Sequence, residues 1–217
     1  MKPFDLIGMA QSAERILVPK SKDAVSGVTA FSEVTGIEIP SAVWEKEYVT
    51  SAGRSFRLVP GADMPGQIVA GWGDIAICST ELVAEAGLKA VESRRIGAPV
   101  CRYSVLALEE RADDWQEFLG RSSRYPVLPR QLPGSFPNFL GMIAAGRDLP
   151  LLPLGVPISG KGEATMRASG IGAVADRVVS GNTAKKLGGR EVFKLADIYP
   201  ELVMRAVDAV SYERSRA

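Results

Sequence analysis

Ser55-Phe56-Arg57-Leu58-Val59-Pro60 and Asp74-Ile75-Ala76-Ile77-Cys78 are two apolar segments, and Asp63-Met64-Pro65 lies between them. Runs of this length, rich in β-branched and aromatic residues and bounded by proline or glycine, are typical of strands. An aspartate followed within two residues by proline is typical of the first turn of a helix. The three segments therefore predict a strand–helix–strand unit, which favours an α/β fold with mostly parallel strands.

The same alternation extends in both directions from this unit. Further strands are predicted at residues 15–18, 102–108, 171–175 and 190–195, and further helices at residues 23–35, 79–87, 113–119, 136–145 and 197–214. The last helix is expected to be amphipathic, with an apolar side made of Leu202, Val203, Ala206, Val207 and Val210.

The composition is that of a globular protein and excludes several classes of partner. The chain has 217 residues, of which 46% are hydrophobic and 24% charged, with a formal net charge of +1. This length suits one large domain or two lobes of about 100 residues each. Such a small net charge favours neither nucleic acid nor an anionic membrane. No apolar run is long enough to span a membrane, and the first residues lack a signal-peptide core, so a cytoplasmic location is expected.

The side chains available for chemistry are limited, because the chain contains no histidine. This excludes histidine-based catalytic triads, histidine metal sites and a histidine general base. Cys78 and Cys101 lie in apolar runs without metal-ligand spacing, which favours reduced thiols. Carboxylates, hydroxyls, a metal held by oxygen ligands, or charge placement must therefore carry any reaction.

A candidate phosphate site follows the strand predicted at residues 171–175. Asp176 ends that strand, and Ser180-Gly181-Asn182-Thr183 opens a short helix that closes at Gly188. The start of a helix has free N–H groups, the two hydroxyls add donors, and glycine permits close approach, so this loop can hold a phosphate. Asp176 can accept hydrogen bonds from sugar hydroxyls. The alternative is an ordinary helix capped by serine or threonine.

A second glycine-rich stretch, Gly155-Val156-Pro157-Ile158-Ser159-Gly160-Lys161-Gly162, nearly matches a nucleoside-triphosphate loop. Gly162 stands where the motif needs a magnesium-binding serine or threonine, and Pro157 lacks a backbone donor. The stretch is therefore not a triphosphate loop, although Lys161 remains a candidate anion contact.

An ordered set of short motifs spans roughly residues 15–195. Its members are Pro19-Lys20-Ser21-Lys22, Arg57, Asp63-Met64-Pro65, the segment from Gly71 to Ile77, Glu81, Cys101-Arg102, Tyr125-Pro126, Glu163, Asp176, Ser180-Gly181-Asn182-Thr183-Ala184 and Gly188. In this order they resemble the motifs of the catalytic subunit of ATP phosphoribosyltransferase, the first enzyme of histidine biosynthesis. The proline-rich segment at residues 126–157 has no counterpart in that pattern.

The resemblance implies a two-lobe type II periplasmic-binding-protein-like fold with mixed, mostly parallel sheets. Residues 1–107 and 190–217 would form lobe 1, and residues 108–189 would form lobe 2, with the ligand cleft between them. The chain looks like the short form of the family, which implies a homo-oligomer that works with a separate regulatory subunit.

The reaction implied by the resemblance is transfer of the phosphoribosyl group of phosphoribosyl pyrophosphate (PRPP) to a ring nitrogen of ATP or a related base, with release of pyrophosphate. The expected catalytic residues are Lys20, Arg57 and Asp176. Residues 180–183 would hold the 5-phosphate and Asp176 the ribose. The expected pyrophosphate and acceptor contacts are Lys20, Lys22, Arg57, Arg102, Lys161 and Glu163. Mg²⁺ is expected as a cofactor bound through the substrate and not by protein side chains.

Two other functions fit the same fold. One is a non-catalytic two-lobe protein that binds a small anionic ligand. The other is a homologue that has lost catalysis and acts as a regulatory subunit. For each basic residue, a solvated surface side chain is the simplest alternative, above all for Lys22.

Overall fold

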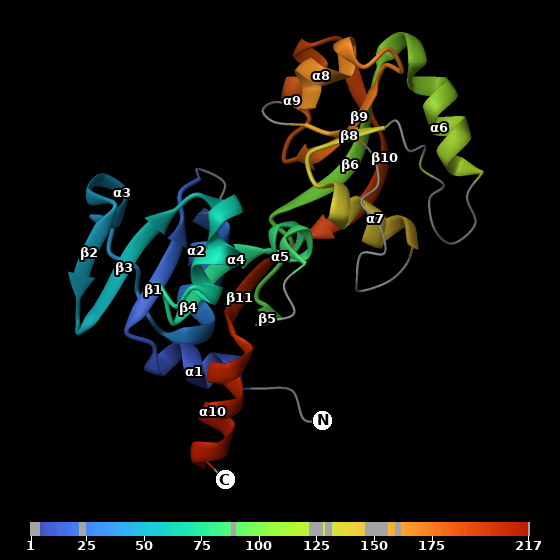
Figure 1. Cartoon of the computed structure of the whole chain (residues 1–217). Coiled ribbons are helices and arrows are strands. Elements are labelled where there is room, and N and C mark those ends of the chain that lie inside the picture. The colour runs from blue at the N-terminus through green and yellow to red at the C-terminus, as the bar shows by residue number, and fades with distance from the viewer. Residues whose placement is uncertain are drawn as a thin grey trace. The chain divides into compact units, whose positions relative to one another are not determined.

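The structure, a computed structural model, describes residues 5–21, 25–87, 90–121, 128, 132–145, 156–158 and 162–216. The chain forms two compact units (Figure 1): unit 1 consists of Met1–Val100 and Tyr199–Ala217, and unit 2 of Cys101–Ile198. Strands β6 (Cys101–Leu108) and β10 (Gly189–Ile198) pair with each other along their whole length, so both belong to unit 2. The chain therefore changes unit before β6 and after β10, and not near residues 107 and 190 as the sequence suggested.

Unit 1 is built on a six-stranded sheet with the order β2-β3-β1-β4-β11-β5. The strands are β1 (Arg15–Pro19), β2 (Tyr48–Ser51), β3 (Arg54–Val59), β4 (Ile75–Ser79), β5 (Val91–Arg95) and β11 (Pro200–Arg205). Strand β4 is buried at every position, because one hydrophobic cluster holds Ile75 and Ile77 and another holds Ala76 and Cys78. A core on both faces of the sheet explains why β4 reads as a continuous apolar run.

The helices of unit 1 cover both faces of this sheet. They are α1 (Leu6–Ser12), α2 (Val25–Thr35), α3 (Val43–Lys46), α4 (Met64–Val69), α5 (Thr80–Ala86), α10 (Ala206–Arg216) and the 3₁₀ turn η2 (Gly61–Asp63). Asp63 is the N-cap residue of α4 and Pro65 lies in its first turn, as predicted, although the Asp63 side chain makes no capping hydrogen bond.

Unit 2 is built on a five-stranded sheet with the order β10-β6-β9-β7-β8. Its other elements are β7 (Pro133–Gly134), β8 (Val156–Pro157), β9 (Ala173–Val178), the 3₁₀ turn η3 (Glu109–Arg111), α6 (Ala112–Gly120), α7 (Pro137–Ala145), α8 (Gly162–Ala168) and α9 (Asn182–Lys186). Met166 of α8 and Ala184 of α9 share one buried cluster with Leu106, Val174 and Val178 of the sheet. Figure 1 shows α6 on the side of the sheet away from α8 and α9.

The predicted α/β architecture with mixed sheets is confirmed, but parallel pairs do not predominate. Within the described part of the chain, four strand pairs are parallel and five are antiparallel. Strands β6 and β10 are antiparallel because the chain enters unit 2 along one and leaves along the other.

The helix predicted at residues 197–214 is wrong over its first half. Residues Pro200–Arg205 form β11, which lies between β4 and β5, and helix α10 begins only at Ala206. Leu202 and Val203 are both buried because they point to opposite faces of the sheet, whereas a helix would have placed them side by side. Val207, expected on the apolar side, is 65% exposed.

Candidate functional site

The predicted phosphate loop connects β9 to α9 in unit 2. Gly181 is the N-cap residue of α9 with a φ of 73°, a conformation that favours glycine. Ser180, Asn182 and Thr183 are exposed, whereas Ala184 is buried and anchors the helix. No side chain caps α9, and the one local bond is a long one, from the Asn182 N–H to Ser180 Oγ at 3.4 Å. Among the described residues the Ser180 hydroxyl thus accepts one long bond from the first turn and the Thr183 hydroxyl makes none, and the N–H groups of that turn have no partner within the helix.

Asp176 lies within β9 and not after it, and its carboxylate is held by three donors. Ser135 Oγ donates to Oδ1 at 2.8 Å, the Arg177 N–H donates to Oδ1 at 2.7 Å, and the Gly162 N–H donates to Oδ2 at 3.1 Å. A Cβ at Gly162 would lie only 2.2 Å from Asp176 Oδ2, so α8 can begin this close only with glycine. The described contacts of this carboxylate therefore join β9 to the start of α8.

Arg102 and Glu191 form an ion pair next to the loop, and the sequence did not suggest it. Arg102 Nε donates to both carboxylate oxygens of Glu191 at 2.6 and 2.8 Å, and Ser104 Oγ donates to the same carboxylate at 2.7 Å. These bonds hold the pKa of Glu191 below its ordinary value, and Glu191 raises the pKa of Arg102. Arg102 Nη1 also donates to the Val179 carbonyl at 3.3 Å. The pair thus fixes the backbone one residue before Ser180.

Lys20 and Arg57, both in unit 1, are not neighbours along the sheet. Arg57 pairs with Leu17 in the parallel register, so Lys20 lies three residues farther along β1, about 10 Å away. Lys20 forms an ion pair with Glu47, which lowers the pKa of that carboxyl through a hydrogen bond. The sequence predicts that both residues contact the pyrophosphate, and with this register they could do so only through the reach of their long side chains.

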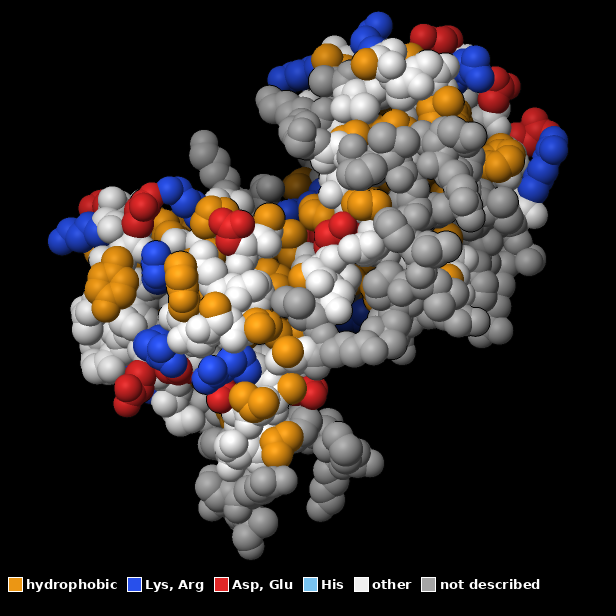
Figure 2. Space-filling view, in the orientation of Figure 1, with side chains coloured by type: hydrophobic (Ala, Val, Ile, Leu, Met, Phe, Trp, Pro, Cys, Tyr) orange, Lys and Arg blue, Asp and Glu red, His pale blue; other side chains and the backbone are white. Residues whose placement is uncertain are grey.

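Arg57 lines a small pocket of about 170 Å³ in unit 1. Its guanidinium lies over the Trp72 ring, 5.3 Å from the centroid, and Tyr48 is its partner on β2. Within the described ranges Arg57 has no ion-pair partner. Figure 2 shows hydrophobic and basic side chains beside one another on this face of unit 1.

Arg15 lines the same pocket, but its charge is already paired. Its guanidinium binds Asp74 and donates to the Gly71 carbonyl at 2.8 Å. Burial raises the pKa of the Asp74 carboxyl, but hydrogen bonds from the Arg15 side chain and from two backbone N–H groups outweigh burial and leave that pKa lowered. Of the two arginines that line this pocket, Arg57 is thus the one without an ion-pair partner among the described residues.

The remaining predicted site residues lie wholly or partly outside the described residues. Lys22 and Lys161 are not described, and Glu163 is described only as a backbone position in α8. Among described side chains, no group of three carboxylates or thiols lies close enough to hold a metal ion. The helices that the structure describes include none with the length and apolarity needed to cross a membrane.

Comparison with known proteins supports the fold and does not identify a family. No protein-family model matches the sequence, and no curated protein matches it either. Among solved structures, the chain is similar to the ATP phosphoribosyl transferase (HisG:HisZ) complex from Thermotoga maritima. The two are 18% identical with a TM-score of 0.60, over 93% of this chain and 92% of that chain.

Two further structures are similar at lower scores. A histidine kinase sensor domain with similarity to periplasmic binding proteins is 12% identical over 92% of this chain and 85% of its own, with a TM-score of 0.48. The alkanesulfonate-binding protein SsuA from Xanthomonas axonopodis pv. citri is 11% identical over 91% of this chain and 66% of its own, with a TM-score of 0.47. The chain forms two α/β units, and its fold is similar to that of the ATP phosphoribosyl transferase complex.

Proposed function

We propose that this chain is a phosphoribosyltransferase that binds PRPP through unit 2 and transfers its phosphoribosyl group to a ring nitrogen of ATP or a related base. The observation that carries the proposal is the loop at residues 180–183: its Ser180 and Thr183 hydroxyls are exposed, and among the described contacts Thr183 makes no hydrogen bond and Ser180 only one long one. This geometry favours the phosphate interpretation of Ser180-Gly181-Asn182-Thr183 over an ordinary capped helix. The similarity of the fold to an ATP phosphoribosyl transferase complex supports the choice of donor.

In this proposal the loop at residues 180–183 binds the 5-phosphate. Asp176 lies in β9, the strand that precedes the loop, and would contact the ribose. Arg102 becomes a positioning residue, because it is bonded to Glu191 and to the Val179 carbonyl. Departure of pyrophosphate leaves an oxocarbenium-like ribose, so positioning and charge stabilisation carry most of the catalysis. Such a reaction requires no histidine.

Basic residues and Mg²⁺ would stabilise the leaving pyrophosphate. Lys20, Lys22 and Arg57 remain the proposed pyrophosphate contacts, and Lys161 and Glu163 the proposed acceptor contacts. The proposed Mg²⁺ ion would be held mainly by pyrophosphate oxygens. When bound, Mg²⁺ would neutralise charge on the leaving group. A separate regulatory subunit is proposed on the same likeness to a two-component complex.

A second candidate function is binding of an anionic ligand without catalysis. The specific observation in its favour is that two predicted substrate contacts, Lys20 and Arg102, are already paired with Glu47 and Glu191. A cation that is neutralised within the protein has less charge to offer a developing pyrophosphate.

Pyrophosphate release separates these two functions. The purified chain is incubated with PRPP, Mg²⁺ and ATP, and in parallel with other purine and pyrimidine bases, while PRPP affinity is measured by calorimetry. The transferase proposal expects pyrophosphate formation that depends on both donor and acceptor. PRPP binding without pyrophosphate formation for any acceptor would establish the second function. Absence of PRPP binding would overturn the transferase proposal.

A further inference from the structure

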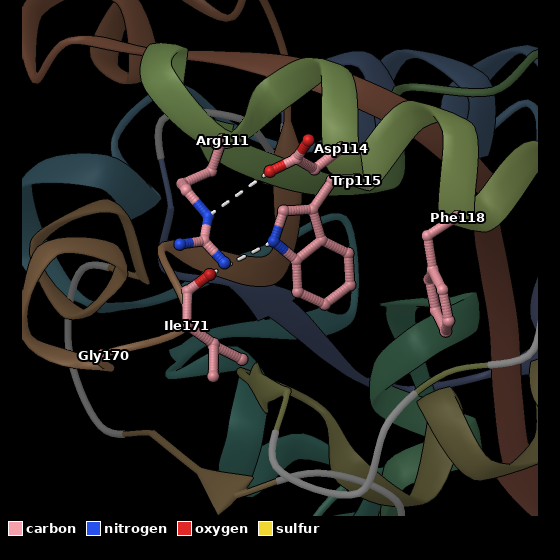
Figure 3. A pocket seen from close by; sticks show the side chains of 6 residues that line it. All are labelled: Arg111, Asp114, Trp115, Phe118, Gly170 and Ile171. Carbon is pink, nitrogen blue, oxygen red and sulfur yellow. Dashed lines mark hydrogen bonds and ion pairs between the residues drawn. The ribbon is translucent and has the colours of Figure 1, made fainter.

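A pocket of about 340 Å³ lies in unit 2, and none of its described lining residues belongs to the proposed phosphate loop. It is lined by Arg111 of η3, by Asp114, Trp115 and Phe118 of α6, and by the Gly170–Ile171 turn that follows α8. Figure 3 shows the Arg111, Trp115 and Phe118 side chains projecting from the same side of η3 and α6, with Ile171 facing Trp115. This volume falls at the small end of pockets that bind small molecules, which span about 300–1,000 Å³.

The walls of the pocket are fixed before any ligand binds. Trp115 Nε1 donates to the Ile171 carbonyl at 3.2 Å, and the Leu108 N–H donates to the Gly172 carbonyl at 2.8 Å. Next to Trp115 on α6, Ala112 and Leu119 are fully buried and hold the helix on the unit. A preformed pocket binds with a smaller ordering cost than one assembled around its ligand.

The floor of the pocket is apolar and aromatic. Because the indole N–H of Trp115 is already bonded, its ring offers only an apolar surface. The Phe118 ring meets the Trp115 ring edge-on, with 5.9 Å between the ring centroids, and Phe118 is 42% exposed. A ligand with an apolar or aromatic body would cover these rings and remove their surface from water.

Among the described residues that line the pocket, one side chain is positive and one is negative. Arg111 Nε and Asp114 Oδ2 are 3.8 Å apart, and both side chains are more than half exposed, so their ion pair contributes little to stability. A ligand with a single negative charge would be attracted by Arg111 but repelled by Asp114. A ligand that carries both charges can pair with each of them, so the rim favours a dipolar head group.

From this combination we infer that the pocket binds a zwitterionic α-amino acid with an apolar or aromatic side chain. The carboxylate would pair with Arg111, the ammonium with Asp114, and the side chain would pack on Trp115 and Phe118. This inference is independent of the proposed transferase activity, because none of these residues belongs to the loop at residues 180–183.

Three probes of one shape test the inference by calorimetry on the full chain. L-phenylalanine carries both charges, 3-phenylpropanoate lacks the ammonium, and 2-phenylethylamine lacks the carboxylate. L-phenylalanine should bind at least about tenfold more tightly than either analogue, since each analogue leaves one charge-assisted hydrogen bond unmade. No detectable binding of L-phenylalanine, or equal binding of 3-phenylpropanoate, would overturn the inference.

Variants then assign each charge to its partner. Arg111→Gln should leave L-phenylalanine no tighter than 2-phenylethylamine, and Asp114→Asn should leave it no tighter than 3-phenylpropanoate. Phe118→Ala, at an exposed position that tolerates truncation, should weaken all three probes. The matched controls are Arg121→Gln and Glu117→Gln, an exposed pair at the end of the same helix that does not line the pocket. Equal losses in the controls and in the pocket variants would place binding elsewhere.

Discussion

Replacing Thr183 by alanine tests the phosphate loop most directly, because the two readings of the loop predict opposite results. Thr183 is exposed, and its hydroxyl makes no hydrogen bond within the part of the chain that the structure describes. If the hydroxyl donates to a phosphate, its removal costs about 1.5–3 kcal/mol of binding free energy. PRPP affinity should therefore fall about tenfold to a hundredfold.

The stability of Thr183→Ala should move the other way. The unliganded protein loses no hydrogen bond, and alanine has a higher helix propensity than threonine by up to about 0.7 kcal/mol. The melting temperature should thus stay constant or rise by about 1–3 °C. A capping threonine would behave differently, because its loss lowers stability by about 1 kcal/mol.

Titration calorimetry with PRPP and a melting curve measure both quantities on the same sample. Thr29→Ala is the matched control, since Thr29 is an exposed threonine in helix α2 of unit 1 whose hydroxyl donates to the Val25 carbonyl. The control should leave PRPP affinity unchanged. Unchanged affinity in Thr183→Ala, together with a lower melting temperature, would refute the phosphate reading.

Three other predictions can be tested: two concern contacts around the loop, and the third concerns the proposed Mg²⁺. Gly162→Ala should lower the free energy of unfolding by about 1–3 kcal/mol in a urea titration, because its Cβ would meet Asp176 Oδ2. The control Gly66→Ala, in helix α4, has open space around the new Cβ and should raise the free energy of unfolding by about 0.5–1 kcal/mol. Glu191→Gln should cost about 1–3 kcal/mol at neutral pH, as it breaks a charged hydrogen-bonded pair. The pKa of Glu191 is depressed in the folded protein. The difference in free energy of unfolding between the wild type and Glu191→Gln should therefore persist above pH of about 4.3 and vanish as the pH falls through the pKa of Glu191 in the folded state. EDTA should abolish pyrophosphate release without changing the melting curve, and undiminished turnover would remove Mg²⁺ from the proposal.

Much of the fold could be predicted because its central strands carry a local signal. Strands β1, β3, β4 and β6 lie inside their sheets, so their sequences are apolar runs bounded by turn residues. Helix α5 ends at Gly87 in the left-handed conformation, as the glycine at that position predicted. These features depend on neighbours within one or two turns along the chain.

The edge strands β2 and β5 and the strand β11 carry no comparable local signal in the sequence. Strands β2 and β5 lie at the two edges of the unit 1 sheet, and most of their residues are exposed or half-buried without alternation. Strand β11 is a short apolar run, which periodicity alone does not distinguish from a buried helix. Its pairing with β4 and β5, far away in sequence, decides the matter.

The polar contacts of the candidate site were equally hidden, because they join residues distant in sequence. Glu191 meets Arg102 only through the pairing of β10 with β6, and Ser135 reaches Asp176 across 41 positions. A strand acid opposite an arginine is a weak signal until the register is known. The loop at residues 180–183 could be proposed from the sequence because its residue types alone suggest phosphate binding, and that assignment stays a prediction.

Asp176 shows how such hidden contacts change the design of an experiment. Asp176→Asn is the obvious test of a ribose contact. Asparagine, however, would place an amide where the carboxylate accepts hydrogen bonds from Ser135 and Gly162. The substitution should therefore lower the melting temperature as well as any affinity for PRPP. Ser135→Ala is the cleaner comparison, because it loosens the same carboxylate but leaves its charge in place. If Asp176 contacts ribose, Asp176→Asn must weaken PRPP clearly more than Ser135→Ala does, at an equal loss of stability. Equal weakening in both variants would assign Asp176 to holding the start of α8 alone.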